Sequence, residues 1–313
     1  MDSPQVPYPA KEVPLMPLRP TATPDLKTWK QPTHGLTIIY DPPEAKVDIV
    51  LLHGLMGNAY RTWLHEETNI YWPKDLLPHD FVNARIMVFG YDVAVWHPWN
   101  QVSQGWLTGY ASDLLGSLSG YRADISESRP LVFVAHSLGG LVVQQALLSA
   151  RDSRERHHRE IETHTIGICF LGTPHRGASL ATWGERLARI LNIFKPVNCQ
   201  VVSLLGPRSK ALYEMRRSFY NLLEKRKDDC ARIRIVCFYE TIPMVRSCVV
   251  SEESATIDGE LSFPVFANHV EMVRFASQED NGYKSIVREI HHMISSAGSS
   301  HLCPCCRQHC RQR

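Results

Sequence analysis

The sequence predicts an α/β protein whose mostly parallel central sheet is covered by helices on both faces. Two observations carry this prediction. Short apolar runs rich in β-branched residues alternate with longer segments of helical periodicity, which is the pattern of parallel strands joined by crossover helices. The chain also has 313 residues, of which 44% are hydrophobic and 21% charged. This is ordinary globular composition, and it excludes a chain that is mainly disordered.

The elements of the first half follow from local patterns. Apolar, β-branched runs predict strands at residues 36–40, 47–52 and 85–91. In residues 109–121, Leu114, Leu115 and Leu118 share one face, which predicts a helix. The run at 131–134 (LVFV) is apolar throughout, as expected of a strand that is buried on both faces of its sheet.

The second half continues the alternation. Helical spacing of apolar residues predicts a helix at 140–150, and strands are expected at 166–171 and 232–239. Residues 178–227 are expected to form a long helical insertion, either a lid or a segment packed on the core. The segment 151–160 is charged with both signs and is expected to be a solvated loop. A helix at 277–294 closes the fold.

Three segments are expected along the chain. Residues 1–34 hold eight of the 20 prolines, which remove backbone donors, so this part is expected to be a disordered lead-in. Residues 35–295 form the α/β domain. Residues 296–313 are expected to be a disordered tail, because their crowded cysteines lack the paired Cys-x-x-Cys spacing of a zinc site.

Charge and cysteine usage exclude several classes of protein. Lys and Arg total 34 against 32 for Asp and Glu, so the net charge of +2 does not indicate a nucleic-acid partner. The nine cysteines have no framework spacing, which favours a reducing compartment. We see no secretory signal and no run of 18 apolar residues, and therefore expect an intracellular protein that is cytoplasmic or peripheral at membranes.

The segment 131–140 (LVFVAHSLGG) has the pattern of a nucleophile elbow. A strand ends just before Ser137 and a helix begins just after it. The tight turn requires small residues on either side, here Ala135 and Gly139, and leaves the serine Oγ exposed above the sheet. The helix N-terminus behind it favours developing negative charge. The alternative is that Ser137 merely caps the helix, which the strand-to-helix position makes weaker.

Two backbone N–H groups are candidates for an oxyanion hole. One belongs to Leu138, the residue after the nucleophile. The other belongs to Leu55, in the His-Gly loop (HGLMG, 53–57) that follows the strand at 47–52. We expect His53 to brace this loop rather than to transfer protons. A plain glycine-rich turn is the weaker alternative, because two motifs point to one site.

The general base must come late in the chain, because the order in this arrangement is Ser, then acid, then His. His269 lies after the last expected strand and before the closing helix, so it is the candidate base. His291 and His292 fall within the closing helix and are better explained by a solvated face. His175 precedes any candidate acid, and we interpret it as a structural or substrate-side residue.

The acid should follow a strand between the nucleophile and the base. Glu240 directly follows the strand expected at 232–239, where a carboxylate can orient the imidazole of His269 and stabilise its protonated form. Asp258, Glu252 and Glu253 are competing candidates that lie closer to His269 in sequence. Glu240 is preferred over these three.

Tryptophans are concentrated in one part of the chain. Five of the seven lie between residues 63 and 106. They predict either an aromatic mouth suited to an acyl chain or packing beneath a long loop, and the sequence does not separate the two.

Five ordered motifs resemble a known family. They are HGLMG (53–57), AHSLGG (135–140), FLGTPHRG (170–177), FYE (238–240) and NHVEMVRF (268–275). Together, over about 36–294, they resemble the lipase-like serine esterases of the α/β-hydrolase superfamily. The nearest groups are the serine-active-site-containing proteins associated with phosphatidylglycerol remodelling and the lipase-like domains of fungal NLR-type receptors.

The resemblance implies an α/β-hydrolase fold and hydrolysis or transfer of an acyl ester. It places Ser137, Glu240 and His269 on the triad positions, and Leu55 and Leu138 on the oxyanion positions. No metal or organic cofactor is needed. The implied partners are an acyl-ester or phospholipid substrate and a mitochondrial or endoplasmic reticulum membrane that the protein contacts peripherally. An alternative reading is a signalling or interaction module with low or regulated turnover. The sequence does not indicate an oligomeric state.

Overall fold

The computed structural model describes residues 30–54, 57–91, 105–123, 129–175, 210–244 and 248–299. The chain divides into two units, Met1–Gln31 and Pro32–Arg313, and the fold below is that of the second. Three of the predicted segments lie partly outside the described residues: the lead-in up to residue 29, the insertion up to residue 209, and the tail from residue 300.

A seven-stranded sheet forms the centre of this unit, in the order β1-β5-β2-β6-β7-β8-β9. Only β1 runs antiparallel to its neighbour, and the other neighbouring pairs are parallel. This confirms the predicted α/β-hydrolase fold with its mostly parallel sheet. The strands are β1 (Gly35–Tyr40), β2 (Val47–Leu52), β5 (Ala84–Gly90), β6 (Leu131–His136), β7 (Thr165–Leu171), β8 (Arg234–Glu240) and β9 (Leu261–Val265), and a separate hairpin pairs β3 (Leu64–His65) with β4 (Ile70–Tyr71).

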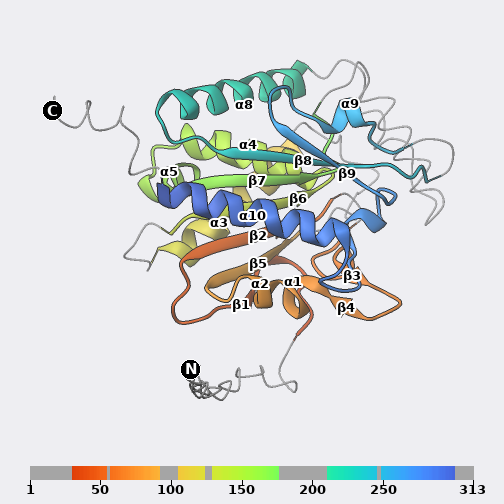
Figure 1. Cartoon of the computed structure of the whole chain (residues 1–313). Helices are drawn as coiled ribbons and strands as arrows, with labels where there is room; N and C mark the ends of the chain where they lie inside the picture. The colour runs from red at the N-terminus through yellow and green to blue at the C-terminus, as the bar shows by residue number, and fades with distance from the viewer. Residues whose placement is uncertain are drawn as a thin grey trace, which may run out of the picture. The chain divides into compact units, whose positions relative to one another are not determined.

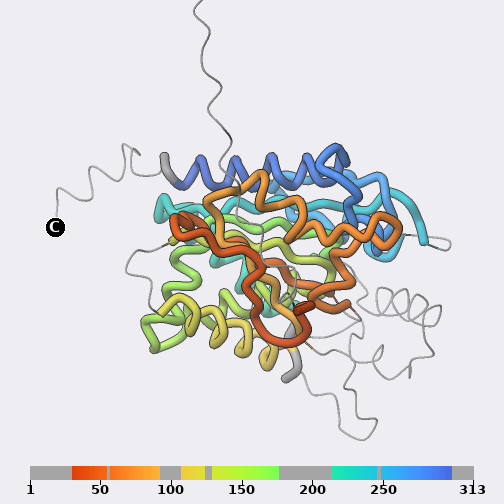
Figure 2. Tube along the Cα trace, turned by 90° about the horizontal axis from the view of Figure 1, so that it is seen from below, coloured from red at the N-terminus to blue at the C-terminus, as the bar shows by residue number. Residues whose placement is uncertain are grey.

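Helices cover both faces of the sheet (Figures 1 and 2). One face carries α3 (Gly105–Arg122), α4 (Gly139–Arg151), α5 (Arg156–His164) and α8 (Lys210–Asp228). The other face carries α1 (Trp72–Asp75), α2 (Leu77–Asp80) and α10 (Asn281–Ser299). Two short elements, α9 (Glu252–Ala255) and the 3₁₀ turn η1 (Glu271–Val273), lie in the connections after β8 and β9.

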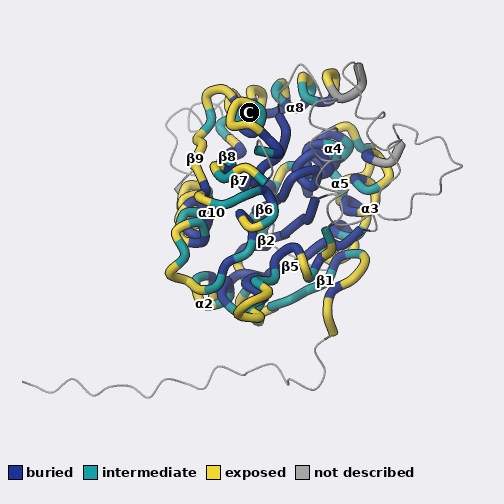
Figure 3. The backbone as a smooth tube through the Cα atoms, turned by 90° about the vertical axis from the view of Figure 1, so that its right-hand side faces the viewer, coloured by how far each residue is buried: buried dark blue, intermediate teal, exposed yellow. Residues whose placement is uncertain are grey.

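The central strands β2, β5 and β6 are buried along their whole length, as Figure 3 shows. Strands covered on both faces need apolar side chains at successive positions, which explains their near-continuous hydrophobic runs. Trp63 and Trp72 are also fully buried, with ring centroids 5.6 Å apart in an edge-to-face contact. These two tryptophans therefore pack within the core. The side chains of Trp96, Trp99 and Trp106 lie outside the described residues.

The prediction of a solvated loop at 151–160 was wrong in part, because α5 begins at Arg156. Arg156 and Glu160 form an ion pair at 2.8 Å one helical turn apart, which supports a helix. Ile161 is buried and anchors the helix to the core. A single apolar residue among many charges is a weak pattern, which is why the sequence did not reveal this helix.

Two boundaries near the C-terminus also differ from expectation. Strand β9 was not predicted, because it is short, largely exposed and contains Pro264, and a proline is tolerated at a sheet edge. Helix α10 begins at Asn281 instead of 277, since the Asp280 carboxylate accepts hydrogen bonds from the N–H groups of Gly282 and Tyr283. It continues through Ser299 into the segment expected as tail. No helix in the described ranges has the length and hydropathy needed to cross a bilayer.

Candidate active site

The predicted site residues gather at one edge of the sheet. His53 follows β2, Ser137 follows β6, Glu240 ends β8 and His269 lies four residues beyond β9. These strands run parallel to one another, so their carboxyl ends share an edge. In open α/β sheets, ligands bind at this edge.

Ser137 has the backbone conformation of a nucleophile elbow. Its φ is +53°, in the left-handed region that non-glycine residues rarely adopt. Its N–H donates to the Leu171 carbonyl at 2.8 Å, and α4 begins two residues later. The turn has no room for larger neighbours, since a Cβ on Gly139 would lie 2.5 Å from the His53 carbonyl oxygen and one on Gly140 2.2 Å from Thr173 Oγ1.

The His-Gly turn lies against the Ser137 side chain. A Cβ on Gly54 would stand 2.6 Å from Ser137 Cβ and 3.2 Å from Ser137 Oγ. The turn therefore reaches the side chain only because Gly54 lacks a Cβ. Leu138, one predicted oxyanion donor, is buried directly before α4. Leu55, the other, lies outside the described residues.

His53 is held on both ring nitrogens. The Tyr91 N–H lies 3.2 Å from Nε2, and Nδ1 lies 2.8 Å from the Gly54 carbonyl oxygen. Because a carbonyl only accepts, Nδ1 carries the hydrogen and Nε2 accepts from Tyr91. The Tyr91 hydroxyl also donates to the His53 carbonyl at 2.6 Å. These contacts brace the turn, and burial lowers the pKa of His53 to about 4, which favours the neutral ring.

Glu240 and His269 form a buried pair. Oε2 of Glu240 lies 3.2 Å from Nδ1 of His269, and both side chains are almost fully enclosed. The other oxygen of Glu240, Oε1, accepts from the Val250 N–H at 2.8 Å, which fixes the carboxylate. The structure thus brings Glu240 to the imidazole, whereas the competing candidates Glu252, Glu253 and Asp258 are exposed.

The loop that carries His269 is anchored at several points. The Asn268 side chain accepts from the N–H groups of Val270 and Glu271 at 3.0 Å each, and Trp72 Nε1 donates to the Val273 carbonyl at 2.8 Å. Both ring nitrogens of His269 are buried and make no hydrogen bond to any residue in the described ranges, although Nδ1 lies 3.2 Å from Glu240. Because Nδ1 faces the carboxylate, Nε2 is the nitrogen left to take a proton from a serine, and catalytic contacts often tighten only when substrate binds.

Gly172 was missed as a site residue by sequence reasoning. Its φ is +58°, and a Cβ there would lie 2.9 Å from Cε1 and 3.0 Å from Nδ1 of His269. The N–H of Ser137 bonds to the carbonyl of the preceding residue, Leu171. Ser137 and the imidazole of His269 therefore both lie against the dipeptide Leu171-Gly172. The available signal was the glycine at the end of an apolar strand in the FLGTPHRG motif.

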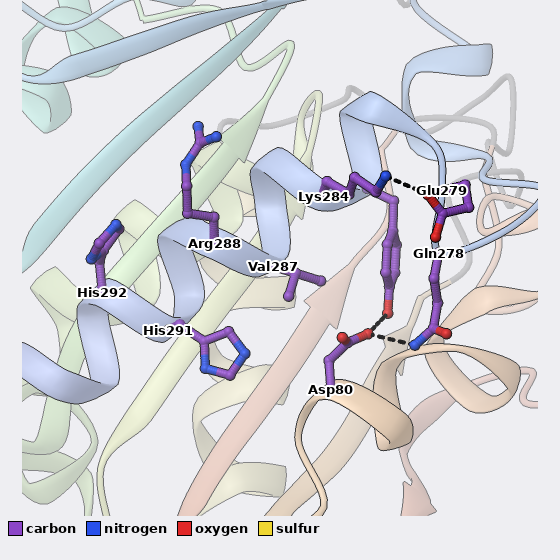
Figure 4. Close-up of a pocket in the computed structure, with 9 residues that line it drawn as sticks. Asp80, Gln278, Glu279, Lys284, Val287, Arg288, His291 and His292 are labelled. Atoms are coloured by element: carbon purple, nitrogen blue, oxygen red, sulfur yellow. Dashed lines mark hydrogen bonds and ion pairs between the residues drawn. The ribbon is translucent and has the colours of Figure 1, made fainter. Parts of the chain in front are cut away.

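Three other histidines that the sequence singles out take no part in the pair of Glu240 and His269. His175 is buried, with Nδ1 3.1 Å from Gln144 Nε2. His291 and His292 line a surface groove between α2 and α10 together with Asp80 and Tyr283 (Figure 4). None of the residues lining that groove belongs to the predicted triad.

We expect the free energy of unfolding to fall as the pH is lowered from 7 to 5. The unfolded chain protonates His53 around its ordinary pKa of 6.5, and the folded protein only near 4. The unfolded state therefore binds more protons in this window, so His53 alone removes about 2 kcal/mol of stability by pH 5. Urea unfolding at both pH values measures the loss, and His53→Gln should reduce it. Equal stability at the two pH values would contradict this reading.

Comparisons with known proteins place the site in context. A family model described as "Putative serine esterase (DUF676)" matches residues 44–227. Protein SERAC1 of Bos taurus is 29% identical over 252 residues, covering 73% of this chain and 36% of that protein. Protein SERAC1 of Danio rerio is 27% identical over 271 residues, covering 78% and 39%. The chain thus spans little more than a third of the length of these curated relatives.

A solved structure from a study of the metagenome-derived lipolytic enzymes LipS and LipT is also similar, with a TM-score of 0.46 and 11% identity, over 84% of this chain and 98% of that chain. The segment matched by the family model includes the His-Gly turn, Ser137 and Gly172, while Glu240 and His269 lie beyond its end.

Proposed function

This chain belongs to the DUF676 serine esterase family, and we propose that it cleaves or transfers acyl esters through a triad of Ser137, His269 and Glu240. The observation that carries the proposal is the buried pair of Glu240 and His269, with oxygen and nitrogen 3.2 Å apart, at the sheet edge that also presents Ser137 at a φ of +53°. A strained serine beside a carboxylate-oriented imidazole is the arrangement that activates a hydroxyl as a nucleophile.

In this mechanism Ser137 Oγ attacks the ester carbonyl carbon while Nε2 of His269 takes its proton. Glu240 holds the imidazole through Nδ1 and stabilises the imidazolium that forms. The backbone N–H groups of Leu138 and Leu55 stabilise the oxyanion, each worth about 10²–10³ in rate. His269 then protonates the leaving alcohol, and the acyl-serine passes its acyl group to water or to another alcohol.

The substrate we propose is the acyl ester of a lipid, reached by peripheral contact with a membrane. Phe266 supports this, because the residue is 88% exposed and lies three residues before His269 at the site edge. An exposed aromatic ring there suits contact with acyl chains. The family resemblance points to phospholipid esters, and to mitochondrial or endoplasmic reticulum membranes as the place of action.

Turnover of p-nitrophenyl esters from acetate to palmitate tests the proposal. We expect measurable hydrolysis that favours the longer acyl chains and falls by about 10³-fold or more in Ser137→Ala. Ser149→Ala, at the far end of α4, is the matched control and should retain wild-type activity. Hydrolysis that survives in a folded Ser137→Ala protein would overturn the triad, and no turnover of any ester by wild type would overturn the esterase assignment.

A further inference from the structure

His136 lies directly before the proposed nucleophile and contacts the proposed base. It is the last residue of β6 and is buried. Its Nε2 lies 2.9 Å from the backbone carbonyl oxygen of His269, across 133 residues of sequence. Because a carbonyl oxygen only accepts, Nε2 must carry the hydrogen and donate it. The residue preceding Ser137 therefore holds the main chain of His269.

The surroundings of His136 keep this donor in its neutral form. Burial is the largest cause that lowers the pKa of His136 well below 6.5, and the neighbouring His269, His53 and Arg274 lower it further. The rings of His136 and His269 lie 4.9 Å apart. When His269 takes the serine proton, its new positive charge opposes a proton on His136. The donor thus remains a neutral imidazole while the base changes charge.

The hydrogen bond acts on the base itself. Trp72 anchors the same loop at Val273, four residues later, and Thr241 and Ile242 donate to the Ala267 carbonyl, two residues earlier. These bonds hold the loop as a whole, whereas the His136 bond fixes the carbonyl of His269. Because the side chain of His269 extends from this backbone, a bond that fixes the His269 carbonyl also sets the direction in which the imidazole points.

We propose that His136 is a positioning residue, whose Nε2–H fixes the backbone of His269 so that the imidazole lies between Ser137 and Glu240. This inference rests on the proposed esterase function. A displacement of about 1 Å of a catalytic group can cost 10²-fold in rate. Loss of the bond should therefore lower kcat, with KM little changed, because His136 bonds to the base, which acts in the chemical step.

A pair of amide variants tests the role. In His136→Gln the side-chain nitrogen reaches about as far as Nε2, whereas in His136→Asn it reaches only as far as Nδ1. Both replacements are uncharged amides that differ by one methylene group. We expect His136→Gln to keep kcat within about fivefold of wild type, and His136→Asn to lose about 10–10²-fold in kcat with KM changed less than about twofold. Thermal unfolding confirms that both fold.

Equal kcat in the two variants would overturn the positioning role, as would a loss in His136→Asn that appears in KM alone. If one variant fails to fold, His136→Phe, which keeps a flat ring and removes the donor, must show the same selective loss of kcat. If hydrolysis by the wild type requires Ser137 but the two His136 variants have the same kcat, only this inference is refuted. Absence of Ser137-dependent hydrolysis would refute the proposed function beneath it.

Discussion

Gly172→Ala should lower kcat/KM for ester hydrolysis by about 10²-fold or more while the protein remains folded. The added methyl group would stand 2.9 Å from Cε1 and 3.0 Å from Nδ1 of His269, and 3.1 Å from Met272 Sδ. The imidazole faces Glu240 with the same Nδ1 atom, so it cannot retreat without disturbing that pair. The left-handed backbone at Gly172 adds a stability cost of about 1–2 kcal/mol.

Gly259→Ala is the matched control for this prediction. Gly259 has a φ of +77°, and a Cβ there would meet nothing within 4 Å. The two variants therefore share the backbone cost, and only Gly172→Ala contacts the base. Thermal unfolding should show a loss of stability in both variants, and steady-state kinetics a loss of activity in Gly172→Ala alone. Full activity in Gly172→Ala would mean that the imidazole of the working enzyme does not lie where the structure places it.

Asp48→Asn should lower the free energy of unfolding by about 3–5 kcal/mol. Asp48 is fully buried at the start of β2 and is the shared partner of three guanidinium groups. Arg85 binds it through two hydrogen bonds at 3.0 and 2.9 Å, Arg129 binds it at 3.0 Å, and Arg122 also contacts it. Removing the carboxylate charge leaves three cations close together in a largely enclosed site.

Urea unfolding of Asp48→Asn measures this loss, and Asp152→Asn is the control. Asp152 pairs with Arg151 at the surface, where the Asp152 side chain is 67% exposed, so its loss should cost at most about 1 kcal/mol. Asp48 is the second residue of β2, whereas the site lies beyond the other end of that strand, and the folded variant should retain its rate of ester hydrolysis. A loss below 1 kcal/mol in Asp48→Asn would show that the arginines do not depend on this charge.

The parts of the fold that could be predicted are those determined by neighbouring residues in the sequence. Strand β2 begins and ends at the predicted residues, Val47 and Leu52, because a strand covered on both faces is mostly apolar, and its one charged residue, Asp48, is bound by arginines. The elbow around Ser137 is visible as small residues between a strand and a helix. Strand β9 was missed because Pro264 and its exposed positions match no strand pattern, and its place is set by pairing with β8.

The contacts within the site depend on distant segments and could not be predicted in the same way. Sequence order left four acids open, and what separates them is that β8 and β9 run side by side and bring Glu240 to His269. Gly172 and His136 reach the ring and the backbone carbonyl of His269 from the ends of two other strands. Each of these residues looks ordinary in its own local pattern, and its relation to the base exists only in the folded chain.

Covalent labelling of the purified protein with a fluorophosphonate, followed by mass spectrometry, tests the central claim most directly. A serine activated by a triad forms one adduct per chain, whereas an ordinary serine does not react. We predict a single adduct on the peptide that contains Ser137, none in Ser137→Ala, and labelling at least about 10²-fold slower in His269→Ala and Glu240→Ala. An adduct on another residue, or a folded wild-type protein that does not react, would contradict the account.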